Sequence, residues 1–257
     1  MIKVGAGIQI PPNSSRILHD WGLGPRLDTV AVQPGAMIIR RWENGEAIGL
    51  TDVGPKFRAI FHAPYYVIHR ANFHEILHGR AHELGVDIKL GSKVEAYDAE
   101  TPSVTLQNDQ VLIADLIVAA DGRIFLATRT LNKANQFSGI NSKASKVVAD
   151  TAEGPQPTGY AAYRATVKSE SMRGDPDTAW LLEQPNINMW SVCESYLAQC
   201  TTRTDTSLRI GDHKHAMTYM ISGGKTFNMV LAHKDNSDPA LWTPDSARRD
   251  MEDHYNG

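Results

Sequence analysis

Asp121 and Gly122 are the first residues to suggest a binding site, because they directly follow the apolar run LIVAA. A carboxylate and a glycine at the carboxyl end of a parallel strand lie where open α/β sheets bind ligands. Near the start of the chain, Gly5 and Gly7 are spaced closely enough to let the backbone approach a ligand. They do not form a GxGxxG fingerprint, and Asp-Gly is also a common turn. Neither segment identifies a function by itself.

Metal and disulfide chemistry find weaker support. His74, His78 and His82 recur at the spacing of one helix face and could suit a metal. The helix is otherwise charged, however, and such a ladder is more often a solvated face, so no metal site is predicted. Cys193 and Cys200 lie in a polar stretch rich in serine and threonine without ligand-spaced partners, which argues against a zinc site or a disulfide framework.

The composition indicates a globular protein. The chain has 257 residues, 42% of them hydrophobic, and a formal net charge of −3. That charge gives no electrostatic reason to expect nucleic acid or an anionic membrane as partner. There is no apolar run of about 18 residues and no secretory leader at the start, so the default expectation is a soluble cytoplasmic protein.

The first half of the chain predicts helices and strands in an α/β order. A helix is expected after Asn13 or Ser14 as its cap, with Ile17, Leu18 and Trp21 at helical spacing. Asn44-Gly45 predicts the turn of a hairpin over residues 36–53. A second helix is expected from His69 to about Leu84, ended by Gly85.

Residues 86–122 predict four short strands, the last of them the continuous apolar run before Asp121. A strand buried on both faces indicates a parallel sheet covered by helices. From about Gly159 the pattern changes to alternating strands, expected over residues 161–167, 178–183, 215–222 and 225–233. These predict a mainly antiparallel layer, followed by a capped, charged helix at the end of the chain.

Taken in order, several segments resemble the class A flavoprotein monooxygenases, in particular the fungal salicylate-hydroxylase-like group. The segments are VGAGIQIPPNSSRIL, HRANFHEIL, LIVAADG, AAYRATV and HAMTYMISGGKTFNMVL. The resemblance implies an α/β fold: a truncated Rossmann-like FAD-binding domain (residues 1–158) and a mixed, mainly antiparallel substrate-domain sheet (residues 159–257) with the start of a following helix.

The resemblance also implies FAD as cofactor, NAD(P)H as reductant, and O₂ and a small phenolic substrate as partners. A flavin C4a-hydroperoxide would transfer one oxygen atom to the substrate ring. The expected setting of this hydroxylation is fungal secondary metabolism. The protein's part is to position the reactants and exclude water.

Roles for single residues follow from the same resemblance. Gly5, Gly7, Asp121 and Gly122 would lie beside the flavin, and Arg70 would reach its ribityl or phosphate region; Asn72 stands where the family has Asp.

Two residues would act on the substrate. Arg164 would pair with a substrate phenolate or carboxylate, and Tyr219 would orient the ring by a hydrogen bond. The alternative is that Arg164 is an ion-pair residue on a sheet face and Tyr219 a packed aromatic.

Three departures from the family pattern limit the prediction. The chain has no strand–GxGxxG–helix unit before Gly5, and it ends before the Gly-Asp motif that precedes a long helix in the family. Two segments, about 123–139 and 191–209, interrupt the pattern and are interpreted as retained introns or as surface-loop insertions. We therefore also consider an inactive remnant without flavin and a non-enzymatic module that binds aromatic ligands, and we expect poor solubility.

Overall fold

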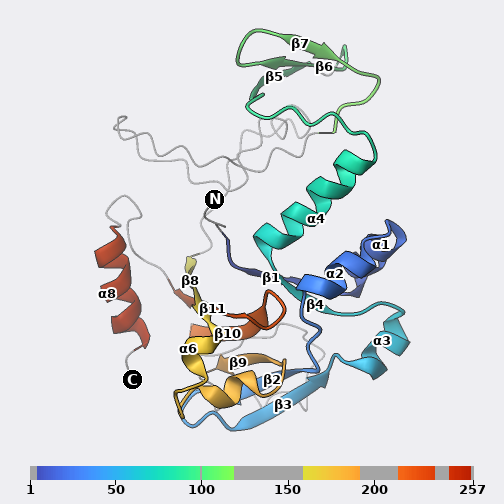
Figure 1. Cartoon of the computed structure of the whole chain (residues 1–257). Coiled ribbons are helices and arrows are strands. Elements are labelled where there is room, and N and C mark those ends of the chain that lie inside the picture. The colour runs from blue at the N-terminus through green and yellow to red at the C-terminus, as the bar shows by residue number, and fades with distance from the viewer. Residues whose placement is uncertain (1–4, 99, 119–158, 192–213, 235–242, 256–257) are drawn as a thin grey trace, which may run out of the picture. The chain divides into compact units, whose positions relative to one another are not determined.

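A computed structural model describes residues 5–98, 100–118, 159–191, 214–234 and 243–255 (Figure 1). The chain packs as two compact units, one formed by residues 1–86 with 159–257 and the other by residues 87–158. The fold is mixed α/β, as predicted. The assignment of residues 1–158 to one functional domain stays a prediction.

The first unit is built around a six-stranded sheet in the order β3-β2-β9-β10-β11-β8. Its strands are β2 (Ala36–Arg41), β3 (Ala47–Asp52), β8 (Tyr160–Lys168), β9 (Ile187–Ser191), β10 (Lys214–Ile221) and β11 (Thr226–Lys234). Only the β2–β9 pairing is parallel. The predicted hairpin therefore forms as β2 and β3. It joins the edge of the predicted antiparallel layer, where β2 pairs with β9.

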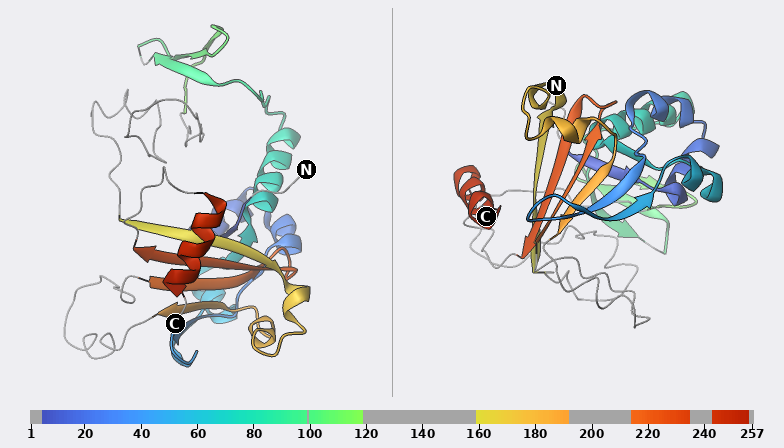
Figure 2. Two further views of the ribbon diagram at one scale, coloured as in Figure 1. Left: turned by 90° about the vertical axis from the view of Figure 1, so that its left-hand side faces the viewer. Right: turned by 90° about the horizontal axis from the view of Figure 1, so that it is seen from below.

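A second layer covers one face of this sheet. It contains the two-stranded ladder β1 (Gly7–Ile10) with β4 (Tyr66–His69) and the helices α1 (Pro12–Asp20), α2 (Gly24–Val30), α3 (Pro55–Phe61) and α4 (Arg70–Glu83). The opposite face carries α8 (Pro244–Tyr255), which lies across the strands (Figure 2). The Tyr255 hydroxyl donates to the Ala232 carbonyl of β11 at 2.6 Å, which ties the helix to the sheet.

Strand β4 and the residue before it lie between two hydrophobic clusters. Tyr66 and Ile68 join the cluster beneath the helices, while Tyr65 and Val67 join the cluster on the large sheet. Successive side chains of a strand point to opposite faces, so a short run of large apolar residues can fill both clusters. This strand thereby fixes the position of α4, which follows it directly.

The second unit contains a three-stranded antiparallel sheet. Its strands are β5 (Val94–Asp98), β6 (Ser103–Leu106) and β7 (Val111–Ile113). Three of the four strands expected over residues 86–122 are therefore accounted for.

The fourth expected strand, the apolar run before Asp121, does not form over its described part. Residues 115–118 are not strand, and Leu116 and Val118 are 77% and 78% exposed. No strand in the described part of the chain pairs with residues 115–118, so no sheet among the described residues buries them. Asp121 and Gly122 lie outside the described residues.

Two local predictions are also corrected. Helix α1 begins at Pro12 with Pro11 as its N-cap, so neither Asn13 nor Ser14 caps it. Proline suits the first helical turn because its fixed φ is helical and its missing N–H would have no partner there. Of the three residues predicted at helical spacing, Leu18 is buried, while Ile17 and Trp21 are exposed.

Residues 178–183, expected as a strand, contain the 3₁₀ helix η1 (Ala179–Leu182). Local bonds explain the difference: Asp175 accepts from the Asp177 amide at 3.0 Å and from the Thr178 hydroxyl at 2.9 Å, which starts a turn. A short helix, α6 (Ser169–Met172), precedes this turn.

The helix expected at the end of the chain forms and is capped as predicted. In α8 the Thr243 hydroxyl accepts from the Ser246 amide at 3.1 Å, and the Ser246 hydroxyl accepts from the Thr243 amide at 2.8 Å. The first predicted insertion lies outside the described residues. Of the second, only Ser191 is described, as the last residue of β9, paired with His215.

Candidate functional site

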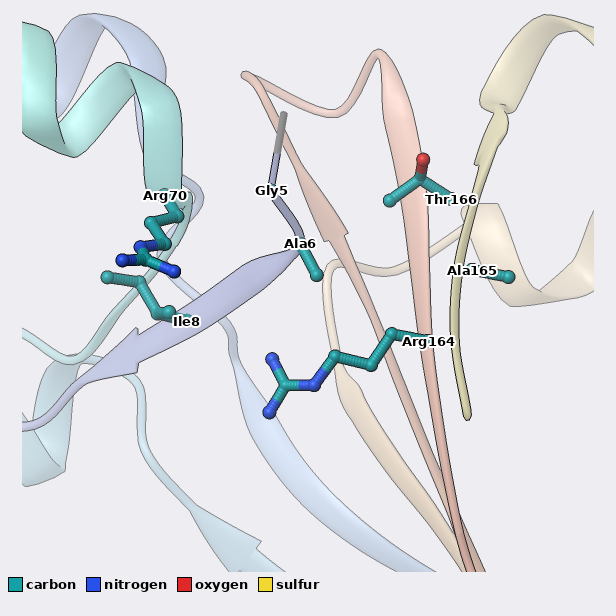
Figure 3. Close-up of a pocket in the computed structure, with 7 residues that line it drawn as sticks. All are labelled: Gly5, Ala6, Ile8, Arg70, Arg164, Ala165 and Thr166. Carbon is teal, nitrogen blue, oxygen red and sulfur yellow. The ribbon is translucent and has the colours of Figure 1, made fainter. Parts of the chain in front are cut away.

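A cleft of about 510 Å³ opens between β1, the start of α4 and strand β8 (Figure 3). The residues that line it are Gly5, Ala6, Ile8, Arg70, Arg164, Ala165 and Thr166. All of them belong to the first compact unit. Residues from segments far apart in the sequence, 5–8, 70 and 164–166, thus form one site.

The N-terminal wall is held by short backbone contacts. The Arg70 amide donates to the Ala6 carbonyl at 3.1 Å, which joins the start of α4 to the chain just before β1. The imidazole of His69 caps α4 by accepting from the Ala71 amide at 3.1 Å. Gly5 has a φ of +143°, and an added Cβ would lie 3.3 Å from the Arg70 Cβ. Glycine suits this position because other residues rarely adopt that φ.

Gly7 is buried behind this wall and does not line the cleft. Its amide donates to the Asn228 Oδ1 at 2.7 Å. A Cβ at this position would come within 2.5 Å of the Tyr219 Cε2 and 2.8 Å of the Asn228 Cγ. The lack of a side chain therefore lets β1 lie directly on the large sheet.

The opposite wall is one face of the large sheet. Thr166, Asn228 and Tyr219 follow one another across β8, β11 and β10 as directly paired residues, so their side chains share a face. Arg164 lies two residues before Thr166 on that face, and its side chain extends toward β1 (Figure 3). Within the described part of the chain, neither Arg164 nor Arg70 has a side-chain hydrogen bond or an ion pair. Two permanent positive charges therefore face one cleft.

Tyr219 is only 3% exposed. Burial raises the pKa of its hydroxyl to about 12, while the nearby Arg164 charge lowers it and Tyr65 raises it. Its hydroxyl makes no hydrogen bond to any described residue. Tyr219 is therefore a neutral hydrogen-bond donor at ordinary pH.

A polar network beside Tyr219 was missed from the sequence. The Tyr65 hydroxyl donates to the Gln9 Oε1, and the Gln9 Nε2 donates to the Met217 Sδ at 2.8 Å. Gln9 lies two residues after Gly7, and Met217 two residues before Tyr219. The alternation of side chains along a strand could have predicted this network, because it places Gln9 on the same face as Gly7 and Met217 on the same face as Tyr219.

The structure separates the predicted site residues into three groups. Gly5, Arg70 and Arg164 line the cleft, whereas Gly7 and Tyr219 contact each other behind it. Asp121 and Gly122 lie outside the described residues. Their functional roles remain proposals.

Asn72 and the histidine ladder lie elsewhere. Asn72 lines a second pocket of about 360 Å³, formed by α2 and α4. The rings of His74 and His78 stack with their centroids 6.1 Å apart. Over the residues that the structure describes, no group of three histidine, cysteine or acidic side chains is arranged to hold a metal. Over the same residues, no helix combines the length and apolarity needed to cross a membrane.

The fold is that of FAD-binding monooxygenases of the salicylate-hydroxylase type. The structure of CtdE in complex with FAD and a substrate matches 98% of this chain and 55% of its own, with a TM-score of 0.69 and 19% identity. A salicylate hydroxylase substrate complex matches 93% of this chain and 51% of its own, with a TM-score of 0.61 and 20% identity.

Sequence comparison identifies the same family. The FAD-dependent monooxygenase OpS4 of Beauveria bassiana is 30% identical over 91% of this chain and 47% of its own length. The 3-amino-4-hydroxybenzoate 2-monooxygenase of Streptomyces cremeus is 27% identical over 88% of this chain and 46% of its own length. No family model matches. The homologues of this chain are thus FAD-dependent monooxygenases, and the chain spans about half the length of these curated relatives.

Proposed function

We propose that this chain forms the substrate-binding sheet and part of the flavin site of an FAD- and NAD(P)H-dependent monooxygenase that hydroxylates a small phenolic or related aromatic compound. The observation that carries the proposal is the cleft with Arg70 on one wall and Arg164, backed by Tyr219, on the other. The names of two relatives support the substrate class: the 3-amino-4-hydroxybenzoate 2-monooxygenase of Streptomyces cremeus and the 3-hydroxybenzoate 6-hydroxylase 1 of Aquipseudomonas alcaligenes are both named for hydroxybenzoates.

The cleft suits part of FAD. Gly5 exposes backbone beside the Arg70 side chain without a Cβ in the way. The Arg70 guanidinium has no ion-pair partner among the described residues and carries the charge that a phosphate or ribityl oxygen would accept. In this proposal Gly5 and Arg70 contact the flavin, and Gly7 supports this wall from behind.

When bound, FAD supplies the redox and oxygen-transfer chemistry, with NAD(P)H as reductant and O₂ as oxidant. The chain's own residues orient the substrate. Arg164 pairs with a phenolate or carboxylate, because its guanidinium is always charged. Tyr219 lies behind the cleft wall and would donate a hydrogen bond to a substrate group that reaches past this wall; its raised pKa keeps the proton on the tyrosine oxygen.

The test separates flavin binding from substrate binding. FAD is titrated into the purified chain, and binding is followed by flavin fluorescence; salicylate and its uncharged methyl ester are then added. We expect Arg70→Gln to weaken FAD binding, and Arg164→Gln to weaken salicylate binding more than ester binding. The control is Arg173→Gln, because Arg173 is exposed and lies outside the cleft.

Three results would contradict the proposal in different ways. If the chain binds no FAD but salicylate raises its melting temperature, it is a binding module for aromatic ligands. If neither ligand binds, it is an inactive remnant. If Arg164→Gln affects both probes equally, Arg164 does not recognise the anionic group.

A further inference from the structure

We infer that Asn228 is a positioning residue that fixes the N-terminal wall of the cleft by holding the Gly7 amide. Asn228 is completely buried, and its Oδ1 accepts from the Gly7 amide at 2.7 Å across 221 residues of sequence. This bond joins the large sheet directly to β1. Asn228 does not line the cleft and acts through Gly7 and its neighbours.

The pairing of β1 leaves the Gly7 amide dependent on this contact. Gly7 stands opposite His69 in the ladder with β4, and the next backbone bond in that direction runs from the Arg70 amide to the Ala6 carbonyl. Bonded and non-bonded pairs alternate in an antiparallel ladder, so the Gly7 amide points away from β4. It points toward the large sheet, where Asn228 supplies the acceptor.

Packing alone does not explain an asparagine at this position. The Nδ2 of Asn228 is buried and has no hydrogen-bond partner among the described residues. A leucine would fill a similar volume without a buried unpaired donor, but it would leave the Gly7 amide unpaired. An asparagine at this position is therefore explained by its side-chain oxygen, which accepts the hydrogen bond from the Gly7 amide.

The contact bears on both walls of the cleft. Gly7 is flanked by Ala6 and Ile8, which line the N-terminal wall, while Asn228 is paired directly with Thr166 on the opposite wall. Asn228 is also paired with Tyr219, whose ring lies against Gly7. Loss of the bond would let β1 move from the sheet and change the width of the cleft.

The test compares two variants. Asn228→Leu removes the oxygen that accepts from the Gly7 amide, whereas Asn228→Asp keeps an oxygen at the Oδ1 position. Thr218→Val is the matched control, because Thr218 is buried on the neighbouring strand and its hydroxyl has no partner in the described part of the chain. Two properties are measured: the hydrogen-exchange rate of the Gly7 amide by NMR, and the dissociation constant for FAD.

We expect Asn228→Leu to speed exchange at Gly7 and to weaken FAD binding, each by about tenfold or more, as loss of a buried hydrogen bond implies. Asn228→Asp should keep both within about threefold of the parent chain, because an aspartate oxygen can still accept. If Asn228 had a merely structural role, both variants would lower the free energy of unfolding, and Asn228→Asp would not restore slow exchange at Gly7 or FAD binding. Thr218→Val should change neither property.

Slow exchange at Gly7 in a folded Asn228→Leu variant would overturn the inference, and so would fast exchange in Asn228→Asp. If the leucine variant does not fold, the aspartate variant still decides. The FAD measurement rests on the proposed function, whereas the Gly7 measurement does not. A parent chain that binds no FAD therefore refutes the function and leaves exchange at Gly7 to decide the role of Asn228.

Discussion

Gly7 lies where strand β1 contacts the large sheet. Its amide reaches Asn228, and the space that a side chain would need is filled by Tyr219. Protein interiors are packed closely, so a single methyl group is enough to disturb such a contact. Gly7 lies between Ala6 and Ile8, which form part of the cleft wall, so a shift at Gly7 would reach the cleft.

Gly7→Ala is therefore expected to destabilise the protein. The added Cβ would come within 2.5 Å of the Tyr219 ring, which is buried and cannot move freely. We expect the free energy of unfolding to fall by about 1–3 kcal/mol, measured by urea denaturation. Gly174→Ala is the control, since no atom lies within 4 Å of its added Cβ, and it should change stability by less than about 0.5 kcal/mol.

The buried hydroxyl of Tyr219 predicts a pH dependence. Its pKa is raised from 10.0 to about 12 in the folded state. As the pH rises above about 10, the unfolded chain releases this proton before the folded chain does, so folding becomes less favourable up to about pH 12. Tyr219→Phe removes this contribution.

Urea denaturation of the parent chain and of Tyr219→Phe at a series of pH values measures the effect. The stability of the parent relative to the variant should be constant below pH 10 and fall toward pH 12. A difference that stays constant over this range would show that Tyr219 ionises as it does in the unfolded chain.

At the scale of elements, β4 and α4 form one unit that brings Arg70 to the cleft. The strand is buried in two hydrophobic clusters, and the helix starts immediately after it with His69 as its cap. Tyr66, at the start of β4, adds hydrogen bonds. Its hydroxyl donates to the Asp28 Oδ1 at 2.6 Å and lies 3.0 Å from the His19 Nε2. The start of α4 is thereby fixed at both the backbone and the cap.

His69→Ala should weaken this junction. The variant leaves the Ala71 amide without its side-chain acceptor, and loss of an N-cap costs about 1 kcal/mol of stability. His69→Asn should keep most of the stability, because asparagine is a favourable N-cap. Thermal unfolding of the three proteins measures the difference. Equal loss in both variants would show that the imidazole acts by packing rather than as a cap.

At the scale of the whole molecule, the two compact units differ in how much side-chain surface they bury. In the described part of the second unit, only Ser103 and Leu106 are buried, and Val111 and Ile113 of β7 are 55% and 73% exposed. The first unit contains both hydrophobic clusters. Local stability follows the buried contacts that an element makes.

We therefore expect amide hydrogens of β5, β6 and β7 to exchange faster than those of β9, β10 and β11. Hydrogen–deuterium exchange followed by mass spectrometry would measure both sets in one sample. The three strands of the second unit should open without the first unit, because few buried side chains hold them. Equal protection of the two sets would mean that the units unfold together.

The sequence by itself determined the local structure where neighbouring residues suffice to set it. Asn44-Gly45 forms the predicted turn, with Gly45 at a φ of +72° and the Asn44 side chain accepting from the Glu46 amide at 3.0 Å. Gly85 ends α4 at a φ of +77°, as glycine can without strain. The alternating pattern of β8, β10 and β11 and the family resemblance were also readable, because both are properties of residue order.

Only the tertiary structure decided which of these elements meet. Period and propensity do not specify a partner, so the contact of Gly7 with Asn228 and the place of β2 beside β9 could not be predicted. The same limit explains why no strand forms over residues 115–118: an apolar run is buried only when another element covers it, and Leu116 and Val118 have none among the described residues. Local backbone preferences act between neighbours in sequence, whereas burial acts between neighbours in space.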